Sequence, residues 1–309
     1  MSIQKIYPKT STPEAKYKKY FNYRTTEDYY EKDSSLSGLR EADFVDENGV
    51  VAVDVPIQGY DKTYTQNQVD HMVSFSKRMW RFGIQKRKLD NAAKELKDSV
   101  ARKKERLCAE RLDYGFDATG TTYTHSAGGA KSRTITITGG DGLGAFDDDH
   151  TREDGGTNMN NIVYDGTTYN LPFDYAGLKA AYTTMGAFVD ARGNPRPGTP
   201  TTLVCKKASS VEFKAKEIKR AISNGKIPEE FSNDGSAVDD FEIITLDYLS
   251  NSAYWYMFDS SRALTDQEGF QFVESEPEHV LESNIVYKTS EIQKKVESMF
   301  DLGHNDVSR

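Results

Sequence analysis

The residues most capable of chemistry are two cysteines and five histidines. Neither Cys108 nor Cys205 has a second cysteine or a histidine at metal-ligand spacing, and no histidine pair follows a pattern such as H-E-x-x-H. The G-x-S-x-G motif that presents a serine nucleophile is also missing from the sequence. We therefore expect two reduced thiols in a cytoplasmic setting, no cofactor, no metal site and no enzyme activity.

A second segment with chemical potential is rich in glycine and aspartate, at residues 139–156. Gly140, Gly142 and Ala145 match a loose form of the dinucleotide fingerprint, but the acidic run after them would repel phosphate and has no helical period. The acids also miss the calcium-loop pattern. We expect a surface loop in which His150 is solvated. A metal-dependent hydrolase that uses Asp147 to Asp149 is the alternative from a different functional class.

Composition describes a folded protein that does not bind nucleic acid over its whole surface. The 309 residues are 37% hydrophobic and 11% aromatic, with a net charge of -8. No apolar run is long enough for a membrane span, and the first residues do not form a secretory signal. Residues 1–24 are basic, whereas residues 141–154 are acidic. The two segments attract each other across a subunit contact, or both are simply solvated.

The first 85 residues are predicted to project from the body. Residues 1–38 form an extended arm whose tyrosines would lie on a neighbouring molecule, with a frayed terminus as the alternative. Residues 39–85 form a long two-stranded projection, with a hairpin signal at Asn48 and Gly49. Such a projection is marginal alone and favours a partner chain. The residues expected to make assembly contacts are Tyr17, Tyr20, Tyr23, Phe44, Val51, Val53, Tyr60 and Tyr64.

Residues 86–113 give the clearest helix. Leu89, Ala93, Leu96, Val100 and Leu107 form one narrow apolar stripe, and oppositely charged pairs four residues apart occupy the other faces. The pattern predicts a strut that lies across a sheet, with a coiled coil as the weaker reading.

From residue 171 the pattern becomes regular. It predicts a helix that starts at Pro172 and Asp174 and has an apolar face of Leu178, Ala181, Tyr182, Met185, Phe188 and Val189. A turn, a buried strand at Leu203, Val204 and Cys205, and a helix capped by Ser209 and Glu212 follow it. Strands are then predicted in "FEIITLDYL", "AYWYMFD" and "FQFVESEP". The turn in "DARGNPRPGTPTTLVCKK" offers no nucleophile and no phosphate loop. The segment is expected to form a rigid turn through Arg192, Gly193, Asn194 and Pro195.

The order of these parts resembles the major capsid protein of tailed bacteriophages, with the Hong Kong 97-like fold. The most specific likeness is a helix that ends in "DARGNP" before a proline segment and "TTLVC". The resemblance implies an α+β protein with an N-terminal arm at 1–38, an extension loop at 39–85, and a spine helix and peripheral domain at 86–170. It also implies an axial domain at 171–250 and return strands of the peripheral domain at 251–309. The long acidic loop departs from a minimal peripheral domain.

The same resemblance implies a function. The chain would assemble with itself into hexamers and pentamers of an icosahedral head that encloses double-stranded DNA, without a membrane and with only indirect contact to the DNA. Portal, scaffolding and decoration proteins would be its partners, and it would assemble in the bacterial cytoplasm before residing in the virion. The runner-up is another virion, tail or encapsulin-type shell component.

Overall fold

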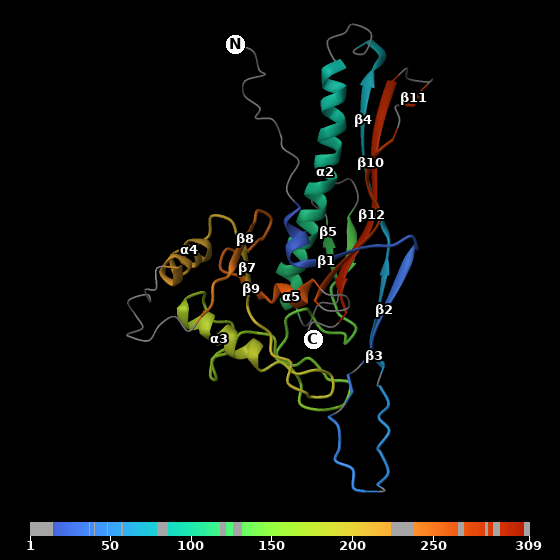
Figure 1. The fold of residues 1–309 in the computed structure, drawn as a ribbon. Helices are drawn as coiled ribbons and strands as arrows, with labels where there is room; N and C mark the ends of the chain where they lie inside the picture. Colours follow the sequence, from blue (N-terminus) through green and yellow to red (C-terminus); the bar gives the residue numbers. More distant parts are fainter. Residues whose placement is uncertain are drawn as a thin grey trace.

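The computed structural model describes residues 15–36, 38–39, 41–47, 49–56, 58–78, 86–117, 122–125, 132–223, 238–264, 269–281, 284–286 and 291–305. Helices and sheets are mixed in it (Figure 1). A long helix lies beside long strands, a smaller group of helices and strands lies to the left in the view, and a narrow loop extends from the bottom.

The largest sheet is built around the last strand of the chain. Its strands are β1 (Phe21–Thr25), β4 (Asn67–Ser76), β10 (Phe270–Val280), β11 (Asn284–Val286) and β12 (Glu291–His304). The central β12 pairs antiparallel with β10 and β11 on one edge and with β4 on the other. Strand β1 runs parallel to β10 at the outer edge. Segments from both ends of the sequence therefore share one sheet.

Helix α2 (Lys86–Asp113) confirms the predicted strut and its bounds. It runs alongside β4, β10 and β12 (Figure 1). Leu96 and Val100 are buried against Val296 of β12, so the narrow apolar stripe packs on the sheet and not on a second helix. Further along, Leu107 joins the main core. The helix therefore packs against three strands of the large sheet.

A second sheet orders β8 (Glu242–Leu246), β7 (Thr202–Lys206) and β9 (Trp255–Phe258). The helices α3 (Tyr175–Gly186), α4 (Ser210–Ser223) and α5 (Ser260–Ala263) accompany it. Leu203 and Cys205 face the core formed with α3 and α4, whereas Val204 faces the main core, as strand alternation requires. The small sheet thus has two buried faces.

The predicted capping residues at the starts of α3 and α4 are confirmed. The Asp174 carboxylate accepts a hydrogen bond from Gly177 N at 2.7 Å. Ser209 Oγ accepts from Glu212 N at 3.2 Å, and the Glu212 carboxylate accepts from Ala208 N at 2.6 Å. Helix α3 ends at Gly186, before the Phe188 and Val189 that the apolar period included.

The N-terminal arm corrects one prediction. Residues 15–25 contain η2 (Lys16–Lys19) and β1, and their apolar side chains pack in the core of their own chain. Tyr17 and Tyr20 are buried there, so the expectation that they cover a neighbouring molecule is wrong. The physical reason is the free edge of β10, which pairs with β1 and gives the arm its burial within the chain. Residues 1–14 lie outside the described part.

The projection also differs from its prediction. Its paired strands are β2 (Tyr30–Leu36) and β3 (Gln58–Thr65), so the hairpin begins within the predicted arm. The described residues 41–47 and 49–56 form no strand, although Gly49 N donates to Asp46 O at 2.8 Å in a turn. Residues 67–76 belong to the large sheet as β4, not to the projection. The predicted residues 79–85 lie outside the described ones.

The glycine- and aspartate-rich segment packs closer to the body than expected. It follows η3 (Tyr114–Phe116) and the short hairpin β5 (Thr122–His125) with β6 (Arg133–Thr136). His150 is buried, not solvated, and its ring bonds Asp141 at 2.7 Å and Asn161 at 3.1 Å. The loop is therefore held in place by internal polar contacts. The helices in the described ranges include none with the length and apolar character of a membrane span.

Candidate assembly surface

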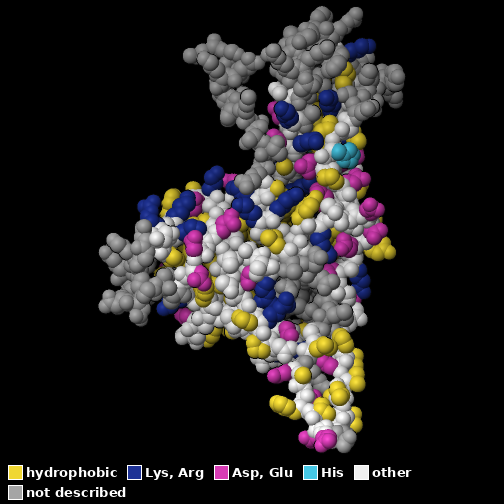
Figure 2. All heavy atoms as spheres, in the orientation of Figure 1, with side chains coloured by type: hydrophobic (Ala, Val, Ile, Leu, Met, Phe, Trp, Pro, Cys, Tyr) yellow, Lys and Arg dark blue, Asp and Glu magenta, His cyan; other side chains and the backbone are white. Residues whose placement is uncertain are grey.

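The projecting loop, defined here as the described residues of 41–56, carries several of the most exposed apolar side chains among the residues that the structure describes. Phe44 has a relative exposure of 108%, and Val51 and Val53 have 69% and 84%. Figure 2 shows hydrophobic side chains along the lower projection and acidic side chains at its end. Val50 and Val55 are equally uncovered, and the valine-rich run "GVVAVDVP" was the signal that could have added them to the predicted residues.

The charge of the projecting loop has one sign. Its acidic residues are Glu41, Asp43, Asp46, Glu47 and Asp54, and the sequence from 41 to 56 holds no lysine or arginine. Acidic groups keep such an apolar segment soluble before it meets a partner. An exposed apolar surface with a uniform charge is typical of an interaction site.

The base of the projection is tied to the body by polar contacts. The predicted contact residue Tyr60 is half-buried, and its hydroxyl bonds the Thr151 hydroxyl at 2.7 Å. Asn305 Nδ2 donates to Tyr60 O at 2.9 Å. Lys62 Nζ donates to Thr138 O at 2.6 Å, and burial together with the charge of Arg111 lowers the pKa of Lys62 to about 8. The base of the hairpin is therefore fixed, and Tyr60 faces its own chain.

The remaining predicted contact residues do not join the projecting loop. Tyr64 is buried in its own chain, as are Tyr17 and Tyr20, and this corrects their assignment to the assembly surface. The ring of Tyr17 lies 4.7 Å from that of Phe272 between centroids. Tyr23 is half-buried, and its hydroxyl bonds the Glu274 carboxylate. Of the predicted set, the structure brings Phe44, Val51 and Val53 together on one exposed loop.

The rigid turn predicted around Arg192 is organised by Asp190. The Asp190 carboxylate accepts hydrogen bonds from Arg192 N at 2.9 Å, Asn194 N at 2.8 Å and Asn194 Nδ2 at 2.8 Å. Burial opposes ionisation of this carboxyl, but the bonds from Asn194 and Arg192 hold its pKa below the usual value. Gly193 has a φ of 81°, which only glycine adopts readily, and Pro195 pairs with Val189 in an isolated bridge.

This turn reaches the projecting loop. Arg192 Nη2 donates to Val55 O at 2.6 Å and lies 3.5 Å from Asp54 Oδ1. Asn194 Nδ2 also approaches Leu39 O, at 3.2 Å. The sequence predicted a rigid turn here but not its contact with a segment about 140 positions earlier, since no local pattern carries that pairing.

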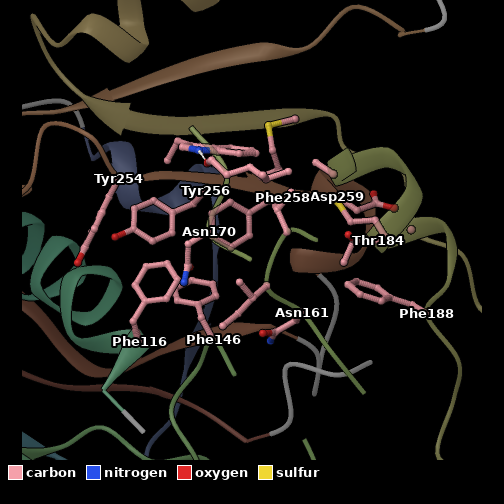
Figure 3. Close-up of a pocket in the computed structure, with 18 of the residues that line it drawn as sticks. Phe116, Phe146, Asn161, Asn170, Thr184, Phe188, Tyr254, Tyr256, Phe258 and Asp259 are labelled. Atoms are coloured by element: carbon pink, nitrogen blue, oxygen red, sulfur yellow. Dashed lines mark hydrogen bonds between the residues drawn. The ribbon is translucent and has the colours of Figure 1, made fainter. Parts of the chain in front are cut away.

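An aromatic cavity of about 670 Å³ lies between the small sheet and the large one. Figure 3 shows Phe116, Phe146 and Tyr256 on its wall. The Phe146 ring lies 4.8 Å from that of Phe116 and 5.2 Å from that of Tyr256, between centroids. The Asp259 carboxylate at the rim accepts from Thr199 N and Ser261 N, so it acts as a cap. The lining is that of a gap between packed layers and presents no paired acid and base.

The acidic loop does not support the metal-dependent alternative. Asp147 accepts from Asp149 N at 3.0 Å, and Asp149 accepts from Asn158 Nδ2 at 2.8 Å. These bonds orient the carboxylates toward their own loop. Within the described ranges, no group of three or more histidine, cysteine, aspartate or glutamate residues is placed to hold a metal ion. Cys108 and Cys205 are buried and free, and burial raises the pKa of both thiols.

The family comparison and the structural comparison with known proteins both give matches. A family model described as phage capsid protein matches residues 59–304. A solved structure from Mycobacterium phage Cain is 10% identical with a TM-score of 0.53, over 99% of this chain and 92% of that one. A solved structure from Mycobacterium phage Adephagia is 11% identical with a TM-score of 0.51, over 99% of this chain and 95% of that one. A solved structure described as "Capsid of empty GTA particle computed with C5 symmetry" is 9% identical with a TM-score of 0.53, over 99% of this chain and 93% of that one. Curated protein sequences give no match.

Proposed function

Because the chain belongs to the phage capsid protein family, we propose that it is the major capsid protein of a tailed bacteriophage and forms an icosahedral head around double-stranded DNA. We further propose that it is a structural shell protein of the virion and not an enzyme. In this proposal the chain has the Hong Kong 97-like domain order, with α2 as spine helix and the unit around β7, β8 and β9 as axial domain. The extension loop then starts at β2, earlier than residue 39.

The observation that carries the proposal is the projecting loop. Burying a valine or phenylalanine side chain contributes on the order of 1.5–3 kcal/mol relative to leaving it exposed. Phe44, Val51 and Val53 forgo that contribution in the single chain. A shell repeats each contact many times, so a modest contact on each copy produces a stable assembly. We therefore assign these three residues to contacts between sister copies.

The partners follow from the same assignment. The chain contacts other copies of itself in hexamers and pentamers, and we propose portal, scaffolding and decoration proteins as further partners. Assembly takes place in the cytoplasm of the bacterial host, and the mature shell resides in the virion. Packaged DNA is contacted only indirectly, since the net charge of -8 gives little attraction for phosphate overall.

Electron microscopy of the purified full chain tests the proposal. We expect closed shells of uniform diameter, or rings of five and six copies where a scaffolding protein is needed. The variant Phe44→Ser/Val51→Ser/Val53→Ser should stay folded and form neither. Monodisperse monomers of the wild-type chain with metal-dependent hydrolysis that is lost in Asp147→Asn would overturn the proposal in favour of an enzyme.

A further inference from the structure

The turn at 190–195 contacts the chain just before the projecting loop and again near the end of that loop. The pairing of β2 with β3 ends at Leu36 and Gln58, and the residues described between them form no strand. Just beyond that point, Asn194 Nδ2 donates to Leu39 O, two residues before the projecting loop, and Arg192 Nη2 donates to Val55 O near its end. A single turn therefore links the two segments of the chain just beyond the last paired residues of β2 and β3.

Packing alone does not fix the direction of the loop. Every described residue of 41–56 is exposed except Asp54, which is half-buried beside Arg192. Exposed backbone without a ladder has little resistance to bending. The hydrogen bonds from Arg192 and Asn194 therefore act on a segment that would otherwise swing about its base.

The turn itself is built to hold its shape. Asp190 accepts three hydrogen bonds from Arg192 and Asn194, and Asp190 N donates to Asn194 O at 2.9 Å. A Cβ at Gly193 would lie 2.6 Å from Arg152 Nη2, and a Cβ at Gly38 would lie 3.0 Å from Asp190 Oδ2. The turn thus packs closely against Arg152 and against the segment that leads into the projecting loop, and a side chain at Gly38 would press against Asp190.

We propose that the turn at 190–195 is a clamp that sets the angle between the projecting loop and the body of the subunit, with Arg192 and Asn194 as the positioning residues. The inference rests on the proposed function, in which the loop contacts a sister copy. A contact repeated over a shell requires that each copy present its loop in nearly the same direction. The clamp fixes the direction of the loop before assembly and so lowers the conformational entropy that is lost when the loop contacts a sister copy.

Distances between two spin labels in the unassembled chain test the clamp. Labels at Ala52→Cys on the loop and Glu217→Cys on α4 are selective, because the native Cys108 and Cys205 are buried. We expect a narrow distance distribution in the otherwise wild-type chain. Arg192→Ala should broaden it at least twofold, and so should Arg192→Met, which keeps the aliphatic stem but removes the donors.

Arg220→Ala on the exposed end of α4 is the matched control and should leave the distribution narrow. Equal widths for the wild-type, Arg192→Ala and Arg192→Met chains would overturn the clamp. The measurement does not depend on shells. If the wild-type chain forms none, the proposed function fails, while the widths still decide whether Arg192 holds the loop.

Discussion

The arm at 15–25 and the projecting loop at 41–56 have similar apolar content but opposite surroundings. Both precede the long helix, and both are predicted from the sequence to find their burial on another molecule. The structure buries Tyr20 and Phe21 of the arm completely in their own chain, whereas Phe44 of the loop is fully exposed. The difference arises because β10 offers an unpaired edge to β1, while the loop extends past the end of its hairpin. A terminal segment rich in tyrosine is therefore not by itself a sign of an intermolecular contact.

The largest loss of subunit stability is expected from Phe21→Ala, which truncates a buried side chain of the arm. Phe21 is buried with its ring 5.1 Å from that of Phe270, between centroids. Truncating a buried phenylalanine costs about 3–5 kcal/mol through lost burial and a residual cavity. Thermal unfolding of the unassembled chain should show a large fall in Tm. An unchanged Tm would mean that the arm is not part of the subunit core.

A similar loss in the free energy of unfolding is expected from Lys104→Met. Lys104 Nζ lies 2.5 Å from Glu274 Oε1 and 2.5 Å from Glu278 Oε2, and Glu274 also accepts from the hydroxyl of Tyr23 in the arm. Removing the cation leaves the buried Glu274 carboxylate uncompensated, at a cost of about 3–5 kcal/mol. Chemical denaturation measures the change. Lys94→Met, at an exposed position of the same helix, is the control and should unfold like the wild-type chain.

A smaller, pH-dependent effect is expected at Glu105, whose carboxylate accepts from Tyr17 N of the arm. Burial raises the pKa of Glu105 from 4.5 to about 6. The folded chain thus holds this proton more tightly than the unfolded chain, so the stabilisation is full below about 4.5 and is lost as the pH rises through about 6. Glu105→Gln should raise stability at pH 8 by less than about 2 kcal/mol and have no such effect near pH 4. A gain of equal size at both pH values would contradict the burial of an ionised Glu105.

The smallest effect on the subunit is expected from Phe44→Ala, the counterpart of Phe21→Ala on the loop. An exposed side chain outside the core changes the free energy of unfolding by no more than about 0.5 kcal/mol. Calorimetry of the unassembled chain should give the wild-type Tm, while light scattering should show weaker assembly. A drop in Tm comparable to that of Phe21→Ala would erase the distinction between the two regions.

The elements that the sequence predicted well are those with local signals. Helix α2 has the predicted bounds because its apolar stripe and charge pairs extend over its whole length. Ser209 and Asp174 mark helix starts through bonds to residues three positions away. The strand at 203–205 also follows from its apolar run.

The errors concern pairing between distant segments. Asn48 and Gly49 indicated a hairpin locally, but the strands that pair are β2 and β3, which lie outside the apolar run. The place of β4 beside β12 depends on residues more than 200 positions away. For the same reason the sequence identified the turn at Arg192 and the exposed Phe44, Val51 and Val53 but not the bond from Arg192 to Val55.

Amide hydrogen exchange of the unassembled chain and of assembled particles, compared segment by segment, tests the division between arm and loop most directly. We predict that the β1 amides that bond to β10 exchange slowly in both states, because their bonds lie within the chain, and that those of 41–56 exchange fast in the subunit and at least tenfold more slowly in the particle. Equal exchange of 41–56 in the two states, or protection of β1 that arises only on assembly, would contradict the account.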